Sequence, residues 1–437
     1  MRLFYRLTTY IAVFLFYLAF MDLHAPIGIT WLDWHAHRIF NAVEFLKVNG
    51  YFYYYGYSIW DSCENCSLDP SNWQENIYVS KHIISLLPYA LINHFGGQEY
   101  LFLLGPMLDK LVVFACAALI AELIIQSIKG ITEIPLFLIG VITFSLFAVS
   151  PWAYKMIIAS WPVIYFLMFF LLGIVSFRNG KFMLGCISFF ISGVFNYQFA
   201  IAIAGFYSLI VMISFLLKPG LNSNQYFPLH VKSLNQKFLV IFFLVLPTFL
   251  MVFTRIILLQ SSELISTSGS SLLYRIGISG DDIHNGGLLG AIQFLGGNRI
   301  TQCLGSSGLQ DLSGDLSLKI AMFNCIMSIS GMGILSLISI IGVYFLIKDS
   351  SEAKSIFLPL IFSLLIFISV LQQSLSVHLM GYSFIFAGLF SAGLVYIMSL
   401  MQQKLGSLIL GLVFSIPCIF GVLILSVRIS MLTGVNG

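Results

Sequence analysis

The sequence has little charge for its length. Only 9% of its 437 residues are Asp, Glu, Lys or Arg, while 59% are hydrophobic and 41 are phenylalanine. The chain has no cluster of about 4–8 basic residues, the kind of patch that binds nucleic acid or anionic lipid. Nucleic acid is therefore not an expected partner.

The chain also lacks a recognisable metal site. Of its seven cysteines, Cys63 and Cys66 form one C-x-x-C, which has neither a second pair nor a His-x-x-x-His partner. In an oxidising compartment this spacing favours a disulfide, and the partner of Cys303 stays open. Cys116, Cys186 and Cys418 fall in apolar runs and are expected to pack there. We expect neither a metal nor another cofactor.

Long apolar runs are abundant. Because runs of roughly 18 or more apolar residues recur many times, the sequence predicts an all-α polytopic membrane protein. We expect a single transmembrane domain over residues 1–437 with about eleven membrane-spanning helices. The predicted spans are 7–21, 111–128, 134–150, 157–177, 182–198, 199–217, 238–260, 320–347, 355–376, 380–400 and 406–427.

The placement of Lys and Arg predicts the orientation. Arg2 and Arg6 precede the first apolar run, no small-residue cleavage site follows it, and we expect a retained helix with a cytoplasmic N-terminus. The cytoplasmic connections then carry most of the basic residues, as the positive-inside rule requires. These residues are Lys129, Arg178, Lys181, Lys218, Lys232, Lys237, Lys348, Lys354 and Lys404.

Two long regions fall outside the membrane in this arrangement, 22–110 and 261–319. In the first, residues 33–48 have the apolar spacing of an amphipathic helix on the membrane surface. Residues 77–95, which include Pro88, predict an interfacial or shallow re-entrant helix. The second region is rich in Gly and Ser, which fits a mobile lid or a plain solvated loop equally well.

Charge is also scarce in the middle of the predicted spans, and the charged residues Asp109, Lys110, Lys155 and Arg255, together with His378, fall at their outer ends. An ion-coupled transporter needs carboxylates or broken helices near the midplane, and a pore needs a polar lining. The sequence also has no clear internal repeat. These absences disfavour transport and favour a site at the outer membrane face.

The densest polar stretch, Trp31 to Arg38, directly follows the first apolar run. Asp33 is the candidate general base for an acceptor hydroxyl or amide. Cations at outer helix ends and in outer loops would bind a phosphate leaving group, although such residues usually reach to the headgroups, and histidines would orient substrates or donate protons. The candidate substrate-binding residues are His35, His37, Arg38, His82, Lys155, Arg255, Arg275, Arg299 and His378.

Residues 33–54 resemble the first outer loop of the GT-C superfamily of membrane glycosyltransferases. In that superfamily an acid after the first span precedes an aromatic residue or His, an interfacial helix and a Gly before Tyr. Residues 150–162 are similar to the Pro-bearing hairpin between the third and fourth spans. The resemblance covers about sixty of the 437 residues. The matching positions in the first loop are Asp33, His37, Ala42, Leu46, Gly50 and Tyr51.

The resemblance implies a polyprenyl-phosphate-linked sugar as donor, Asp33 as catalytic base and an inverting transfer at the outer face of a bacterial inner membrane. The acceptor would be a glycan or glycolipid such as the O-antigen of lipopolysaccharide, as for O-antigen-modifying glucosyltransferases. No second acid stands beside Asp33, which argues against the metal-dependent oligosaccharyltransferases and the mannosyltransferases with adjacent acids. Two alternatives stay open: an O-antigen-type polymerase, which predicts essential Arg275 and Arg299, and a flippase or transporter of lipid-linked substrates.

Overall fold

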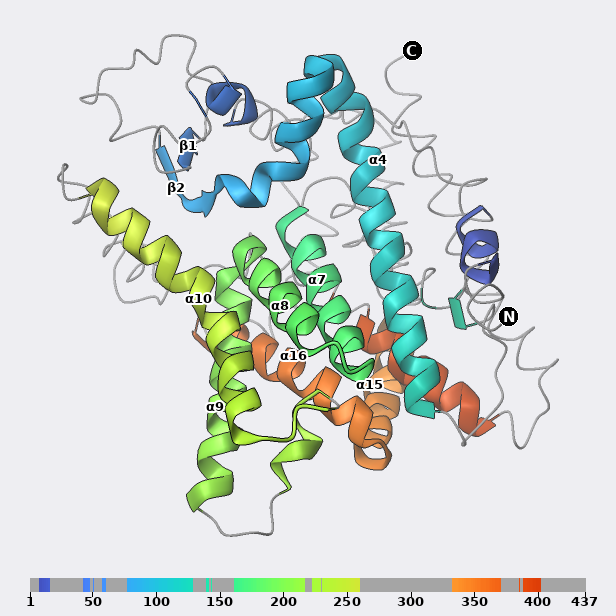
Figure 1. Cartoon of the computed structure of the whole chain (residues 1–437). Helices are drawn as coiled ribbons and strands as arrows, with labels where there is room; N and C mark the ends of the chain where they lie inside the picture. Colours follow the sequence, from blue (N-terminus) through green and yellow to red (C-terminus); the bar gives the residue numbers. More distant parts are fainter. Residues whose placement is uncertain are drawn as a thin grey trace, which may run out of the picture.

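The protein is described from a computed structural model, and the described part is almost entirely α-helical (Figure 1). The described residues are 8–15, 42–47, 50, 57–59, 77–128, 139–140, 143, 161–216, 222–228, 230–259, 332–370, 385 and 388–401. The predicted span 7–21 is described over 8–15, the span 134–150 only at 139–140 and 143, and 406–427 lies outside the described residues.

Helices occur where the apolar runs predict them. The long helices are α4 (Leu87–Ile128), α7 (Trp161–Arg178), α8 (Phe182–Phe195), α9 (Tyr197–Leu216), α10 (Leu234–Leu259), α15 (Met332–Asp349) and α16 (Ser351–Val370). A further apolar helix covers Gly388–Met401. Two segments, Tyr197–Leu216 and Leu234–Thr254, are long and apolar enough to cross a membrane, judged by length and composition.

Local sequence determines where two of these helices end. Gly180 has φ of 72°. Its N–H donates to the carbonyl of Phe177, and the N–H of Lys181 donates to the carbonyl of Ser176 at 2.9 Å. This is the Schellman arrangement, which favours Gly at the left-handed position. At the other end of α8, the side chain of Asn196 accepts from the N–H of Phe199 at 3.3 Å and caps α9.

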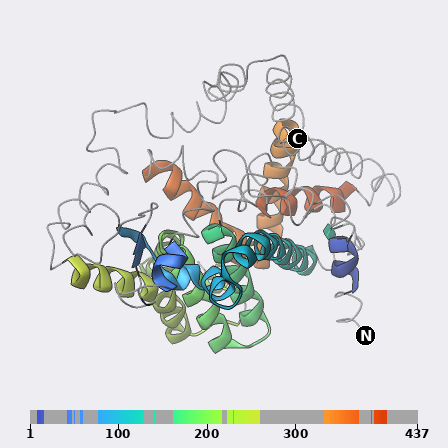
Figure 2. The same ribbon diagram turned by 90° about the horizontal axis from the view of Figure 1, so that it is seen from above.

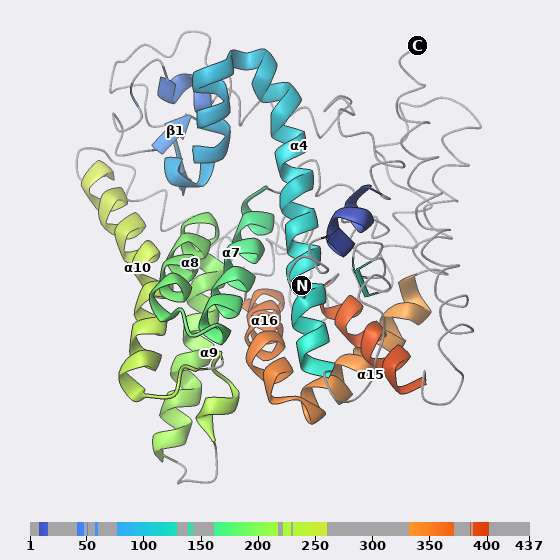
Figure 3. The same cartoon turned by 45° about the vertical axis from the view of Figure 1, so that its right-hand side comes forward.

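The described helices form one bundle. Helices α7 and α8 pack against each other in its middle, α10 packs on α8 and α9, and α16 packs on α9 and α15. Figures 1 and 2 place α10 at one edge of the bundle and the helical segment 8–15 at the opposite edge. Figure 3 shows α4 rising above the ends of α7 and α8.

Helices α7 and α8 pack closely because each carries a glycine opposite an aromatic ring. A Cβ at Gly173 would lie 2.4 Å from the ring of Phe189, and one at Gly185 would lie 2.6 Å from the ring of Phe177. Both phenylalanines are fully buried. Small residues that allow close backbone approach are typical of helix pairs in membranes.

The backbones of α15 and the helix Gly388–Met401 cross even more closely. A Cβ added at Gly342 would lie 2.1 Å from the carbonyl oxygen of Gly393, and one added at Gly393 would lie 1.9 Å from the carbonyl oxygen of Ser339. Only glycine is compatible with this contact. The crossing therefore fixes the two helices at the level of Gly342 and Gly393.

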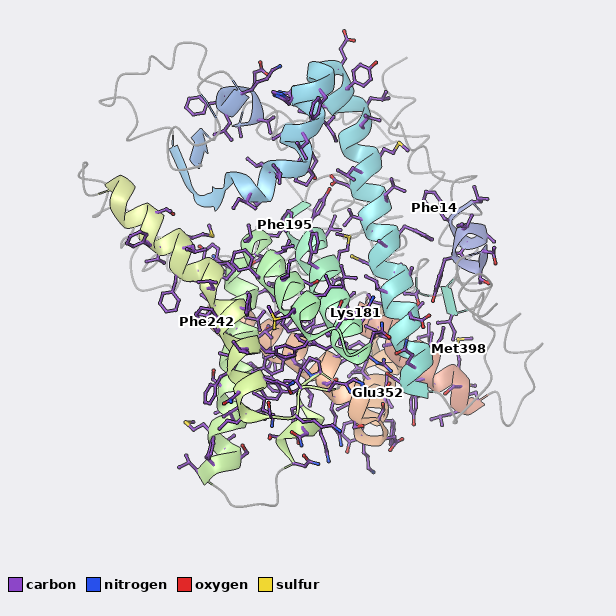
Figure 4. All side chains as sticks on the ribbon, viewed as in Figure 1. Phe14, Lys181, Phe195, Phe242, Glu352 and Met398 are labelled. Carbon is purple, nitrogen blue, oxygen red and sulfur yellow. The ribbon has the colours of Figure 1, made fainter. Side chains whose placement is uncertain are left out.

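Helix α10 has a large exposed apolar face. Its exposed side chains are Leu234, Phe238, Leu239, Phe242, Phe249, Leu250, Val252 and Phe253. Figure 4 shows Phe242 on the outer side of the bundle. Continuous apolar surface of this kind marks a membrane or protein contact.

Basic residues gather at one end of the bundle, which we call the basic end. Helices α7 and α15 finish there at Arg178 and Asp349, and α8 and α16 begin there. Arg178 Nη2 forms a 2.8 Å ion pair with Glu352. Figure 4 shows Glu352 at this end and Phe195 toward the opposite end. The sequence predicts a single side of the membrane for Arg178, Lys181, Lys348 and Lys354, and the structure gathers them at one end of the bundle; that this side is cytoplasmic stays a prediction.

One departure from an all-helical fold lies in the predicted first outer region. Strand β1 (Tyr57–Ile59) pairs antiparallel with β2 (Ile77–His82), with Tyr57 opposite His82. A short 3-10 turn, η2 (Ile83–Leu86), connects β2 to α4. The predicted helix over 77–95 is therefore wrong for 77–82, because Ile77, Tyr78 and Val79 favour an extended chain when a partner strand is present.

Candidate functional site

The structure describes only two of the residues that the sequence analysis assigns to the site. His82 is the last residue of β2, and Arg255 lies in α10, five residues after Leu250; the backbone of both is described. The catalytic candidate Asp33 lies outside the described residues, as do His35, His37, Arg38, Lys155, Arg275, Arg299 and His378. The described part nevertheless contains two elements of the predicted first outer region, the segment 42–47 and the beginning of α4.

The first of these elements is the helical segment 42–47, which begins nine residues after Asp33. Ala42, Val43 and Leu46 are buried in the apolar core. Val43 and Leu46 are two of the apolar positions that the sequence predicts for the amphipathic helix over 33–48, and its placement on the membrane surface stays a prediction. The described residues of this segment are held by this packing against the core.

The second element is the beginning of α4, which turns back on itself. Gly97 has φ of 74° and ψ of −171° inside the helix. This conformation is accessible essentially only to glycine. It divides α4 into a first arm, 87–96, and a second arm, 98–128. The ring of Tyr89 in the first arm lies beside Gly105 in the second, 3.6 Å from the position a Cβ would take.

A polar contact joins the segment 42–47 to the first arm. Asn93 is fully buried, and its Nδ2 donates to Glu44 Oε2 at 2.8 Å. A carboxylate only accepts hydrogen bonds, which fixes the orientation of the Asn93 amide. Lys47 Nζ lies 3.9 Å from the same Glu44 oxygen, on the partly exposed side of the contact. We call this pair, Glu44 and Asn93, the clasp.

A second polar contact lies one helical turn earlier and joins the two arms. The hydroxyl of Tyr89 donates to Asp109 Oδ1, and both side chains are buried. Tyr165 of α7 packs edge-on against Tyr89, with ring centroids 6.3 Å apart, and stacks on Phe195 of α8 at 4.9 Å. The carboxylate of Asp109 is therefore enclosed by α4, α7 and their aromatic side chains.

The depth of Asp109 follows from the length of the second arm. Asp109 precedes Ile128 by 19 residues, which is about 28 Å of helix. The hydrocarbon core of a bilayer is about 30 Å thick. If the second arm spans from the basic end, Asp109 lies at the outer boundary of the core, as the sequence predicts for it.

The electrostatics of this cluster follow from burial. Burial first, and then the nearby carboxylate of Asp109, raise the pKa of Tyr89 well above its ordinary value. Tyr89 therefore stays protonated and remains a donor at any physiological pH. The hydroxyl of Tyr165 is buried close to Tyr89 and Asp109 but is poorly aligned for a hydrogen bond to either. A buried carboxylate in an apolar helix bundle makes Asp109 a candidate functional residue.

The arrangement offers hydrogen-bonding groups and no metal centre. Among the described residues no three His, Cys, Asp or Glu side chains come together as metal ligands. The two cysteines of the described part, Cys116 and Cys186, are buried and unpaired, in agreement with the packing role predicted for them.

Comparison with known proteins identifies no family for this sequence. No protein-family model matches the sequence, and no curated protein matches it either.

Sequence reasoning placed Asp109 at the outer end of a span but did not identify its partners or the clasp. Tyr89 precedes Asp109 by 20 positions and Glu44 precedes Asn93 by 49, so no helical periodicity connects them. The one available signal was the pair Gly96 and Gly97, which marks a possible reversal inside an otherwise helical segment.

Proposed function

We propose that the chain is a membrane glycosyltransferase that moves a sugar from a polyprenyl-phosphate-linked donor to a glycan or glycolipid acceptor. Asp33 is the general base that takes the acceptor proton. The reaction takes place at the outer face of a bacterial inner membrane, and the acceptor is a lipopolysaccharide glycan such as O-antigen.

The observation that carries the proposal is the docking of the segment 42–47. An acid followed by an amphipathic helix that packs on the end of an apolar bundle is the layout that the resemblance to the GT-C superfamily leads one to expect. In this chain the apolar face of the segment is buried, and the clasp attaches it to the first arm of α4. The basic end, which carries Arg178 and Glu352, lies at the other end of the bundle.

The distribution of buried charge also favours surface chemistry over ion transport. Among the described residues only two ionisable Asp, Glu, Lys or Arg side chains are classed as buried, Asp109 and Lys237. Asp109 lies at the outer boundary in the arrangement above, and Lys237 is in the first turn of α10. The described helices therefore carry no buried charge at their middles, where a coupled transporter needs it.

Replacing Asp33 by Asn tests the proposal. The purified full-length protein is reconstituted in liposomes with a panel of radiolabelled polyprenyl-phosphate hexoses and lipopolysaccharide as acceptor. We expect the wild type to transfer one of these sugars. Asp33→Asn should lower the rate by about a hundredfold or more, since general-base catalysis contributes about 10²–10⁴-fold.

Asp61→Asn is the matched control, because it makes the same change in the same predicted outer region. It should retain wild-type transfer at equal abundance in the membrane. If Asp33→Asn transfers sugar at the wild-type rate, Asp33 is not the catalytic base. If the wild type transfers no sugar from any donor of the panel, the proposed donor class is wrong.

A further inference from the structure

Lys237 is a buried cation without an acidic partner. It lies in the first turn of α10 and is only 6% exposed, and no Asp or Glu among the described residues forms an ion pair with it. The helices around it cannot supply one, because residues 134–262, which include α7, α8, α9 and α10, contain no Asp or Glu. Glu352 of α16 pairs with Arg178 instead. A buried charge is costly unless it is paired and hydrogen-bonded.

The groups beside this ammonium do not balance its charge. Lys237 Nζ donates to Ser223 Oγ at 2.6 Å, in the short helix η3 (Ser223–Gln225), and lies 5.3 Å from the centre of the Phe227 ring. The start of α10 adds a partial positive charge of its own. The bond to Ser223 uses one N–H of the ammonium and leaves the other N–H groups, and the Ser223 O–H, without an acceptor among the described residues.

Donors that meet beside a positive charge, with no acceptor between them, form a site for an anion. We propose that Lys237 and Ser223 bind a phosphate group, whose oxygens accept from Nζ and from the hydroxyl. Phosphate suits the pair because its several oxygens can accept from both residues at once and its charge balances the ammonium. The site lies at the end of the bundle away from the clasp (Figure 1) and does not depend on the proposed function.

The surface beside Lys237 favours a membrane lipid as the source of the phosphate. Leu234 lies one turn before Lys237 on the same side of α10, is 41% exposed and begins the exposed apolar face of this helix. A lipid whose phosphate binds Lys237 can lay its acyl chains along that face. Basic pockets between membrane helices bind anionic headgroups in this way. A soluble phosphate compound has the same binding chemistry, so the experiment separates the two sources.

The melting temperature of the full-length protein, washed free of lipid in dodecyl maltoside and kept in phosphate-free buffer, tests the site. Phosphatidylglycerol is added in one arm and inorganic phosphate in the other. Phosphatidylcholine, whose phosphate is balanced by its own choline, is the reference. We expect phosphatidylglycerol to raise the Tm of the wild type by about 2 °C or more above that in phosphatidylcholine. Lys237→Met should remove this increment, because methionine fills a similar space without the charge.

Lys181→Met is the matched control. Lys181 is an exposed cation at the same end of the bundle, and its replacement should leave the increment unchanged. Ser223→Ala keeps the charge of Lys237 and removes one donor, so it should reduce the increment without abolishing it.

The two arms identify the source of the phosphate. An increment with inorganic phosphate that Lys237→Met removes supports the site and assigns it to a soluble phosphate compound. An increment that persists in Lys237→Met, or no increment in the wild type from either addition, overturns the site. If Lys237→Met yields no folded protein, native mass spectrometry of Ser223→Ala decides. This variant should retain less phosphatidylglycerol than the wild type, and equal retention overturns the site.

Discussion

Asp109 is accommodated in an apolar bundle because its neighbours are phenols. Tyr89 donates to one carboxylate oxygen, and Tyr165 stands edge-on to Tyr89 with its hydroxyl close to Asp109 and Tyr89 but poorly aligned for a hydrogen bond. The two tyrosines have similar burial but different hydrogen bonding. Their hydroxyl groups should therefore contribute differently to stability, although the same atom is removed by Tyr→Phe in each case.

We predict that Tyr89→Phe destabilises the protein by about 1.5–3 kcal/mol, the range for a hydrogen bond to a charged group. Tyr165→Phe should cost less than Tyr89→Phe, because the Tyr165 hydroxyl lies close to Asp109 and Tyr89 but is poorly aligned for a hydrogen bond to either. Thermal unfolding in one detergent measures both variants. Tyr344→Phe, at an exposed tyrosine of α15, is the control for the substitution itself. Equal losses in Tyr89→Phe and Tyr165→Phe would contradict this account of the cluster.

Sequence reasoning worked at the residue scale only for properties that depend on neighbouring residues. The apolar positions Val43 and Leu46 were predictable from helical spacing, and both are buried. The partners of Glu44 and Asp109 were not, because each contact needs the reversal at Gly97 to bring distant residues together. The assignment of Asp33 stays a prediction.

At the scale of elements, α4 extends further than its prediction. The sequence predicts an interfacial helix over 77–95 and a separate span over 111–128, and the structure has two helical arms, 87–96 and 98–128, that meet at Gly97. Two separate helices are therefore correct, but the bounds of both differ. The residues between the predictions, 96–110, include three glycines and Pro106, which are poor helix formers, so the sequence gave no reason to start the second helix at residue 98.

The crossing of α15 with the helix Gly388–Met401 makes a prediction at the same scale. Gly342→Ala should destabilise the protein by about 1–3 kcal/mol or more, because the added Cβ meets the Gly393 backbone, which cannot rotate away. Gly205→Ala in α9 is the matched control, since a Cβ there meets nothing within 4 Å. It should be neutral or stabilise by about 1 kcal/mol, because Ala favours a helix over Gly.

The melting temperatures of Gly342→Ala and Gly205→Ala, measured in the same detergent, test this prediction. A Gly342→Ala variant as stable as Gly205→Ala would show that the two helices do not cross at this point.

At the scale of the whole molecule, length and hydropathy predicted the helices well and the connections poorly. Apolar runs are a property of neighbouring residues, so the positions of α7, α8, α9 and α10 follow closely from the sequence. The pairing of β1 with β2 joins residues about twenty positions apart and leaves no periodic signal. The basic end lies between these cases: its residues are visible in the sequence, but the ion pair of Arg178 with Glu352 is not.

The orientation of the bundle gives the last prediction. Asn179 and Ser351 are exposed at the basic end, and Glu99 is exposed where the second arm of α4 begins. If the basic end is cytoplasmic, a single cysteine at Asn179 or Ser351 reacts with a membrane-impermeant maleimide only after the membrane is opened. A cysteine at Glu99 reacts in intact spheroplasts. The seven native cysteines are replaced by serine for this measurement, and an unchanged gel-filtration profile verifies the background. Labelling of Asn179→Cys in intact spheroplasts would show that the basic end faces outward. The segment 42–47 and the first arm of α4 would then face the cytoplasm, which contradicts transfer at the outer face.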